Sequence, residues 1–82
     1  GWEIIKNEKN VFFLTKNFKF KNFVDSQKFV NQVGQISEEE GHHPDIKFGW
    51  GYATISITTH AIEGLSENDF ILAAKIDKKT NV

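Results

Sequence analysis

Residues 38–44 read Glu38-Glu39-Glu40-Gly41-His42-His43-Pro44, and this stretch marks where a helix must end and a strand must begin. Gly41 favours the left-handed conformation that commonly terminates a helix. Pro44 cannot continue a helix, and it pushes His43 toward an extended conformation. The stretch therefore predicts a helix that stops at about Glu40, with two adjacent histidines in the loop that leads to the next strand.

The segments before this stretch predict a β-hairpin and a helix. Residues 2–5 and 11–20 read as two strands joined by a polar turn at 7–10. One side of the second strand is apolar, with Lys16 as an interruption: Phe12, Leu14, Phe18 and Phe20. The helix begins after Asn22, a good N-cap, and Asp25 in its first turn suits the helix dipole. Its apolar residues recur at helical spacing: Phe23, Phe29, Val30, Val33 and Ile36.

The segments after the stretch predict a second hairpin. Ile46, Phe48 and Trp50 alternate as a third strand. Gly51-Tyr52 has the composition of a two-residue type II′ turn, with glycine in the first position. A fourth strand follows, rich in β-branched residues, and ends at Thr59-His60.

The last helix is predicted from its N-terminal capping residues. Ser66 is a good N-cap, and Asp69 stands at the reciprocal position of a capping box. Leu65 is expected to pack on Phe70 as a hydrophobic staple. The expected buried side of this helix consists of Phe70, Ala73, Ala74 and Ile76.

The resulting order is β-β-α-β-β-α in one domain spanning residues 1–82. It predicts an α+β fold, a two-layer sandwich in which a four-stranded antiparallel sheet carries both helices on one face. The other face and the edge strands of such a sheet need cover, which favours a homo-oligomer.

Composition excludes several classes of function. The net charge is −1 and all ten basic residues are lysine, so direct nucleic acid binding is not expected. The absence of cysteine excludes disulfides and thiolate chemistry. No apolar run approaches the ~20 residues of a membrane span, and the first residues show no secretory or transit pattern. We therefore expect a cytoplasmic protein without a membrane anchor.

The hairpin brings the chain's three histidines to one corner. Pro44 lies seven residues before the predicted turn and His60 lies eight residues after it. Antiparallel pairing therefore places His60 beside the loop that holds His42 and His43. Asp69 in the last helix and Glu38, about one helical turn before His42, can approach the same corner.

Such a cluster has three interpretations. The histidines can be ordinary surface or strand-end residues, with Asp69 only a helix cap, Glu38 only solvated and Trp50 only a core residue. They can be ligands of zinc or iron together with a carboxylate. They can also be general acids and bases that need no metal, because imidazole exchanges protons near neutral pH.

The pattern Glu38-x3-His42-His43-Pro44-x5-Trp50-x9-His60-x8-Asp69 resembles the signature of the pterin-4a-carbinolamine dehydratases. The β-β-α-β-β-α order is similar to the fold of that family over nearly the whole chain. Family members usually begin with a further helix before the Gly-Trp pair that here is residues 1 and 2, and this helix is absent from the chain.

The resemblance implies that water is removed from a 4a-hydroxytetrahydropterin, such as 4a-hydroxytetrahydrobiopterin, to give the quinonoid dihydropterin. This hydro-lyase step recycles the pterin used by aromatic amino acid hydroxylases. The pterin is the substrate, and neither a metal nor another cofactor is implied. Family members form dimers that often pair into tetramers. In animals they also serve as a dimerisation cofactor of a homeodomain transcription factor, so the alternative is a non-catalytic dimerisation or binding module that acts on a protein partner.

Residue roles follow from the same resemblance. His42 and His43 are the candidate general acids at the 4a-hydroxyl, and His60 binds the pterin and can serve as the base. Glu38 and Asp69 are carboxylates that orient the imidazoles. The residues expected to line the pterin pocket are His42, His43, Pro44, Trp50, Thr59, His60, Ala61 and Ile62.

Overall fold

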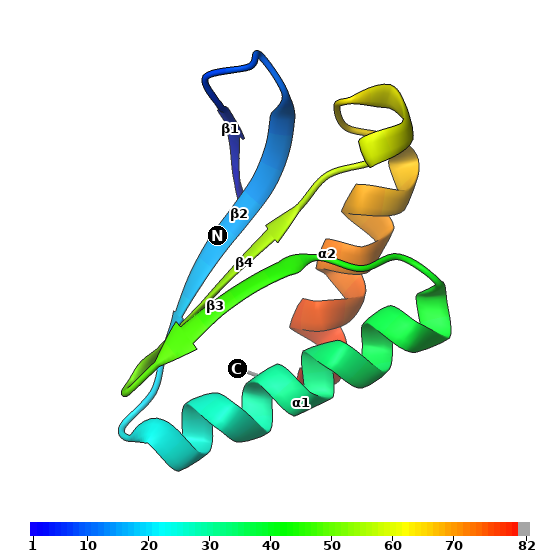
Figure 1. Cartoon of the computed structure of the whole chain (residues 1–82). Helices are drawn as coiled ribbons and strands as arrows, with labels where there is room; N and C mark the ends of the chain where they lie inside the picture. The colour runs from blue at the N-terminus through cyan, green and yellow to red at the C-terminus, as the bar shows by residue number, and fades with distance from the viewer. Residues whose placement is uncertain (81–82) are drawn as a thin grey trace.

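The computed structural model describes residues 1–80, and its element order confirms the predicted α+β fold (Figure 1). The elements are β1 (Glu3–Lys6), β2 (Phe12–Lys19), α1 (Phe23–Glu40), β3 (Asp45–Gly49), β4 (Tyr52–Ile57) and α2 (Glu67–Thr80). A short 3-10 helix, η1 (His60–Ile62), lies between β4 and α2. Within residues 1–80, neither helix is long and apolar enough to cross a membrane.

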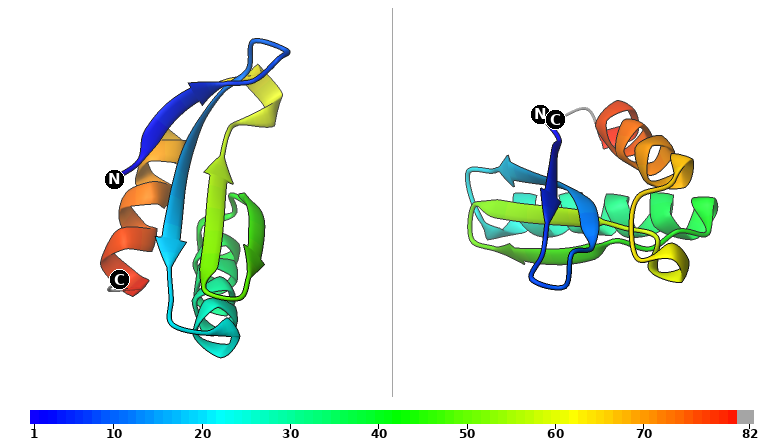
Figure 2. Two further views of the ribbon diagram at one scale, coloured as in Figure 1. Left: turned by 90° about the vertical axis from the view of Figure 1, so that its left-hand side faces the viewer. Right: turned by 90° about the horizontal axis from the view of Figure 1, so that it is seen from above.

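The four strands form one antiparallel sheet in the order β1-β2-β4-β3. Helix α1 packs against β3 and β4, and α2 packs against β2 and α1. Both helices lie behind the sheet in the left view of Figure 2, which leaves its other face uncovered within this chain. The prediction of two layers with the helices on one face is confirmed.

The core lies between the sheet and the two helices. Ile55 and Ile57 from β4 meet Val33 from α1 and Ile76 from α2, and all four side chains are completely buried. Each contributes about 1.5–3 kcal/mol by leaving water. The rings of Phe18 and Phe29 extend the core, with their centroids 4.5 Å apart. The apolar alternation of the strands therefore decides which sheet face the helices cover.

Lys16 does not interrupt the inner side of β2, contrary to the prediction. Its ammonium group pairs with the carboxylate of Asp77 on α2 at 2.9 Å and lies 4.8 Å from the centre of the Phe18 ring. The indole N–H of Trp2 donates to the other oxygen of Asp77 at 2.9 Å. The lysine thus lies on the helix-covered face with its charge neutralised, and the alternation of β2 continues through it.

The predicted buried side of α2 is wrong in two places. Phe70 is 48% exposed and Ala74 is also exposed, whereas Leu72 is buried. The inward residues are Asp69, Leu72, Ala73, Ile76 and Thr80, because the buried carboxylate of Asp69 sets the rotation of the helix. Leu65 packs against the core.

Phe12 is also more exposed than its place on the apolar side of β2 predicted. Its side chain is 47% exposed. It stands at the first position of β2, at the end of the β1–β2 hairpin that projects past both helices in the left view of Figure 2.

The turn of the second hairpin lies one residue earlier than predicted. Gly49 pairs with Tyr52, so the turn residues are Trp50 and Gly51. Trp50 therefore leaves the third strand, and its side chain is 72% exposed at the tip of the hairpin. Gly51 has a φ of +79°, which suits glycine at the second turn position. Its carbonyl accepts a hydrogen bond from Phe20 N–H at 2.8 Å.

Two glycine-to-alanine changes should shift stability in opposite directions. Gly51→Ala forces a side chain into the left-handed region with its Cβ 3.2 Å from the Phe20 carbonyl oxygen, so we expect a loss of about 1–2 kcal/mol. Gly34→Ala, inside α1 with no atom within 4 Å of the added Cβ, should gain about 0.5–1 kcal/mol. Urea unfolding of both variants measures this, and a destabilised Gly34→Ala together with a neutral Gly51→Ala would contradict it.

Candidate active site

The end of α1 is built as the opening stretch predicted. Gly41 adopts the left-handed conformation, with φ 65° and ψ 28°, and its N–H donates to the Glu38 carbonyl. The His42 N–H donates to the Ser37 carbonyl at 3.1 Å, which closes the last turn of the helix. The chain then leaves α1 sharply and enters β3 at Asp45, so both histidines lie in the connection.

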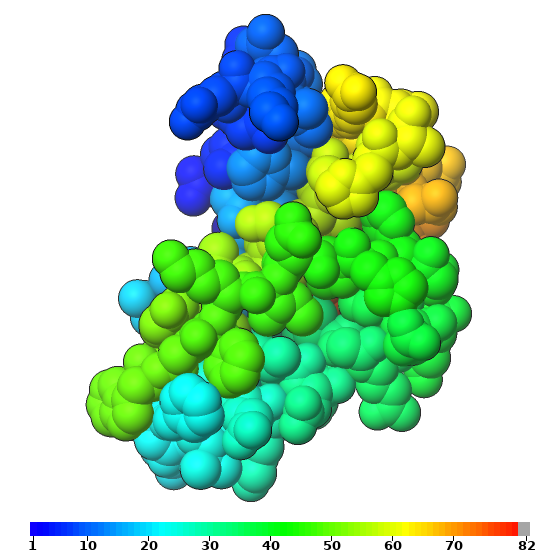
Figure 3. All heavy atoms as spheres, viewed as in Figure 1, coloured from blue at the N-terminus to red at the C-terminus, as the bar shows by residue number. Residues whose placement is uncertain are grey.

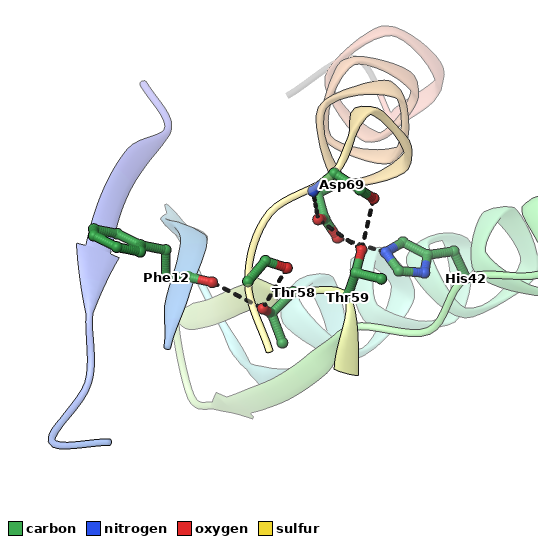
Figure 4. A network of polar contacts seen from close by, with 7 residues as sticks. Phe12, His42, Thr58, Thr59 and Asp69 are labelled. Atoms are coloured by element: carbon green, nitrogen blue, oxygen red, sulfur yellow. Dashed lines mark hydrogen bonds and ion pairs between the residues drawn. The ribbon is translucent and has the colours of Figure 1, made fainter. Parts of the chain in front are cut away.

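The carboxylate of Asp69 is the centre of the polar network at this corner (Figure 4). It is completely buried, and one of its oxygens lies 2.6 Å from Nε2 of His42. The other oxygen accepts from the hydroxyl of Thr59 at 2.8 Å and from the backbone N–H of Ser66 at 2.7 Å. The loop after α1, the end of β4 and the start of α2 thus meet on a single side chain.

The directions of these hydrogen bonds determine which nitrogen of His42 carries a proton. An ionised carboxylate only accepts, so His42 must donate to Asp69 through Nε2–H. The opposite ring nitrogen, Nδ1, is then the one left to exchange a proton with another molecule. Because the single hydroxyl hydrogen of Thr59 goes to Asp69, the 2.7 Å contact between the two hydroxyls has Ser66 as its donor.

Asp69 is both a helix cap and a partner of His42. The sequence analysis treated the capping role and the role beside the histidines as alternatives, and the structure shows both. Its carboxylate receives the Ser66 N–H, which is one half of the predicted capping box. The Ser66 hydroxyl makes its contact with Thr59. This hydroxyl link was not predicted, because Ser66 reads in the sequence only as an N-cap.

His43 forms the second carboxylate–imidazole pair. Its Nε2 hydrogen-bonds to Glu38, as the spacing allowed. Both side chains are mostly exposed, at 62% for His43 and 76% for Glu38, against 19% for the side chain of His42. The Glu38 pair is therefore open to water and contributes little to stability, unlike the buried pair of His42 and Asp69.

His60 begins η1 immediately after Thr59 and is exposed. The backbones of Thr59 and Gly64 bond to each other in both directions, at 2.9 and 3.4 Å, and this closes the turn that carries His60, Ala61 and Ile62. The imidazole of His60 has no hydrogen-bond partner among residues 1–80. It borders an open hollow of about 340 Å³ on the outer face of the sheet.

The structure brings most of the predicted site residues to one corner. His42, Thr59 and Asp69 are directly bonded, and the loop of His43 and half-buried Pro44 adjoins them. Trp50 is the exception. It lies in the turn at the other end of the hairpin, roughly 17 Å away along the five residues of β3, so it forms no aromatic wall in the histidine corner of its own chain.

The described residues contain no group of three or more His, Asp or Glu side chains placed to hold a metal ion. The metal-ligand interpretation of the three histidines and a carboxylate therefore has no geometric support. Proton transfer is the chemistry that these imidazoles and carboxylates can perform as they are arranged.

A sequence model of the family described as "Pterin 4 alpha carbinolamine dehydratase" matches residues 1–79. This chain belongs to that family. The pterin dehydratase family includes a relative from Rubrobacter xylanophilus that is 49% identical over 78 residues, 95% of this chain and 69% of the relative. A relative from Halorhodospira halophila is 61% identical over 62 residues, 76% of this chain and 57% of the relative. Both carry the provisional name pterin-4-alpha-carbinolamine dehydratase.

Two solved structures share the fold. A "transcriptional coactivator/pterin dehydratase" from Brucella melitensis superposes with a TM-score of 0.81 at 28% identity, covering 95% of this chain and 80% of that one. A "pterin dehydratase-like protein" described as a RuBisCO assembly factor of the alpha-carboxysome gives a TM-score of 0.77 at 26% identity, covering 95% and 87%. The family fold thus occurs in proteins described by different roles.

The two carboxylate–imidazole pairs should differ sharply in their effect on folding. Asp69→Ala leaves a buried imidazole, a hydroxyl and a backbone N–H without their acceptor, so we expect a loss of about 3 kcal/mol in the free energy of unfolding. Glu38→Ala removes a solvated partner and should change it by less than about 0.5 kcal/mol. Denaturant unfolding of both variants at neutral pH tests this, and equal losses would refute the assigned difference between the pairs.

Proposed function

We propose that this protein dehydrates a 4a-hydroxytetrahydropterin to the quinonoid dihydropterin, without a metal or other resident cofactor. The observation that carries the proposal is the bond between His42 and the buried Asp69 in a chain of the pterin dehydratase family. The bond leaves one nitrogen of a mostly buried imidazole available for proton transfer, and the names of the relatives support the same reaction class.

The reaction needs one acid and one base. The bond from C4a to the hydroxyl oxygen breaks, and the oxygen leaves as water once an acid has given it a proton. A base removes the proton from N5, and the electrons of that N–H bond form the new C4a=N5 double bond. One molecule of water is lost in total, and no electrons are exchanged with a cofactor.

The two adjacent histidines are the acids of this proposal. His42 donates to Asp69 through Nε2, so its Nδ1 delivers the proton to the departing hydroxyl when the ring is doubly protonated. His43 has a similar partner in Glu38 but in a solvated setting, so we assign the main share of acid catalysis to His42 and a smaller share to His43.

His60 is the base and a pterin contact in this proposal. It has no hydrogen-bond partner within the described chain, so both ring nitrogens are free to meet a substrate. Pro44 and the turn of residues 59–62 form the adjoining walls. Trp50 has no part in this site.

Single replacement of His42, His43 or His60 by Ala should lower the rate of dehydration at least tenfold, since a positioned acid or base is worth roughly 10²–10⁴ in rate. A stopped-flow assay with a 4a-hydroxytetrahydropterin, corrected for the spontaneous reaction, measures this. Glu39→Ala is the control. The side chain of Glu39 pairs with Lys79 close to the histidine loop, and its removal should leave the rate of dehydration at that of the wild type. The proposal fails if all three folded histidine variants react at that rate.

A second candidate, a binding module, is favoured by the surface at the opposite end of the hairpin. Exposed apolar side chains gather there from the start of α1, the end of β3 and the β3–β4 turn: Phe23, Val24, Phe48 and Trp50. The rings of Phe23 and Phe48 lie 5.6 Å apart. We call this group the aromatic end. Its occupant in this candidate function is a second copy of the chain, which would cover apolar surface that is costly to leave in water.

The two candidate functions can be separated by mutation. Trp50→Ser should weaken self-association while dehydration is retained, and His60→Ala should do the opposite. Light scattering after size exclusion, over a hundredfold range of protein concentration, measures the first effect. A wild-type protein that stays monomeric throughout, or a Trp50→Ser variant of unchanged mass, would exclude the aromatic end as a contact between copies.

A further inference from the structure

The side chain of Ser66 does not cap the helix that it precedes. A serine at this position of a capping box accepts the N–H of the third helical residue with its hydroxyl oxygen. Here that N–H, from Asp69, donates to the backbone carbonyl of Ser66 at 3.1 Å. The Ser66 hydroxyl instead lies 2.7 Å from the hydroxyl of Thr59. The hydroxyl of Ser66 is therefore directed to the corner that holds the histidines.

Ser66, Thr59 and Asp69 form a series of hydrogen bonds that runs in one direction. Thr59 donates its only hydroxyl hydrogen to Asp69 at 2.8 Å, so Ser66 is the donor to Thr59. The series ends at His42, whose Nε2 lies 2.6 Å from the other carboxylate oxygen. In Figure 3 the green loop after α1, the yellow turn after β4 and the orange start of α2 pack against one another around it.

The Ser66 hydroxyl restricts the hydrogen of Thr59. A hydroxyl hydrogen rotates freely about its C–O bond unless its surroundings fix it. The hydrogen of Ser66 occupies one acceptor position on the Thr59 oxygen, which leaves the hydrogen of Thr59 directed at the completely buried carboxylate of Asp69. With donors on both of its oxygens, this carboxylate is held in one plane.

The orientation of the Asp69 carboxylate determines the orientation of the His42 ring. The Nε2–H bond of the imidazole points at one carboxylate oxygen, so a carboxylate that turns takes the ring with it. Nδ1, on the opposite side of the ring, then turns as well. Proton transfer depends on close and aligned atoms, and a small misplacement of the acid lowers the rate.

We propose that Ser66 is a positioning residue for the proposed dehydration. Through Thr59 and Asp69, its hydroxyl holds the ring of His42 so that Nδ1 faces the departing 4a-hydroxyl. The inference rests on the proposed dehydratase function and adds a residue to it. Ser66 exchanges no proton with the substrate.

Ser66→Ala removes the hydroxyl and keeps the backbone N–H that donates to Asp69. We expect kcat for dehydration to fall roughly fivefold to tenfold, the effect of one hydrogen bond, while KM changes by less than about twofold. Ser66→Thr, which keeps a hydroxyl, should retain kcat to within about twofold of the wild type. Ser66→Gly is a second variant without the hydroxyl, and it should show the same loss because glycine is well tolerated before a helix.

Ser26→Ala is the matched control. Ser26 is completely buried near the start of α1, at the end of that helix remote from the histidines, and its hydroxyl donates to the Asn22 carbonyl at 3.1 Å. Its replacement removes a hydrogen-bonded serine hydroxyl and should leave kcat unchanged. In a Thr59→Val background, Ser66→Ala should lower kcat by less than about twofold, because the series of hydrogen bonds is already broken there.

Proton NMR gives a second readout that requires no turnover. The Nε2–H proton of His42, donated to a buried carboxylate, should give a resolved downfield signal. Ser66→Ala should shift or broaden this signal, and Ser26→Ala should leave it in place.

The inference is overturned if the folded Ser66→Ala and Ser66→Gly variants keep the kcat or the His42 signal of the wild type. It is also overturned if Ser66→Thr is as slow as Ser66→Ala, or if the losses from Ser66→Ala and Thr59→Val multiply. Absence of dehydration above the spontaneous rate in the wild type overturns the proposed function instead. The NMR signal then still decides whether Ser66 positions His42.

Discussion

The buried carboxylate of Asp69 holds the histidine corner together. Ser66 reaches it from the start of α2, Thr59 from the end of β4 and His42 from the loop after α1. A buried charge is costly without partners, and here each oxygen has at least one donor, so the four residues favour one arrangement. The rotation of α2, which turns Leu72 inward and Phe70 outward, also follows from keeping this carboxylate inside.

Local signals in the sequence predicted much of this architecture. Gly41 and Pro44 determine the end of α1, and the alternation of β4 determines which face the helices cover. Strand order also allowed Asp69, a short way after His60 in the chain, to approach the same corner as His42, because antiparallel pairing brings the outer ends of the second hairpin's strands to one sheet end. Such features depend on backbone conformation and on periodicity, which a single sequence records well.

Features that depend on one residue of register or on distant contacts could not be predicted in the same way. Trp50-Gly51 and Gly51-Tyr52 are both acceptable turn pairs, and only the observed pairing of Gly49 with Tyr52 moves Trp50 out of the strand. In the sequence Lys16 interrupts the apolar side of β2, because its partner, Asp77, lies 61 residues away in the chain. The hollow beside His60 could not be predicted, because its walls come from four segments and their polar residues have the pattern of an ordinary solvated strand face.

The short strand β1 affects the stability of the hollow beside His60. All four of its residues are exposed, and it is held by pairing with β2 and by Trp2, which donates to Asp77 and meets Phe18 edge-on. A strand with so little buried surface opens at a lower free-energy cost than the core strands, so its amide hydrogens should exchange with solvent first. Asn7 directly follows this strand. Asn7 lines the hollow beside His60, so opening of β1 would widen the hollow and leave the bond between His42 and Asp69 in place.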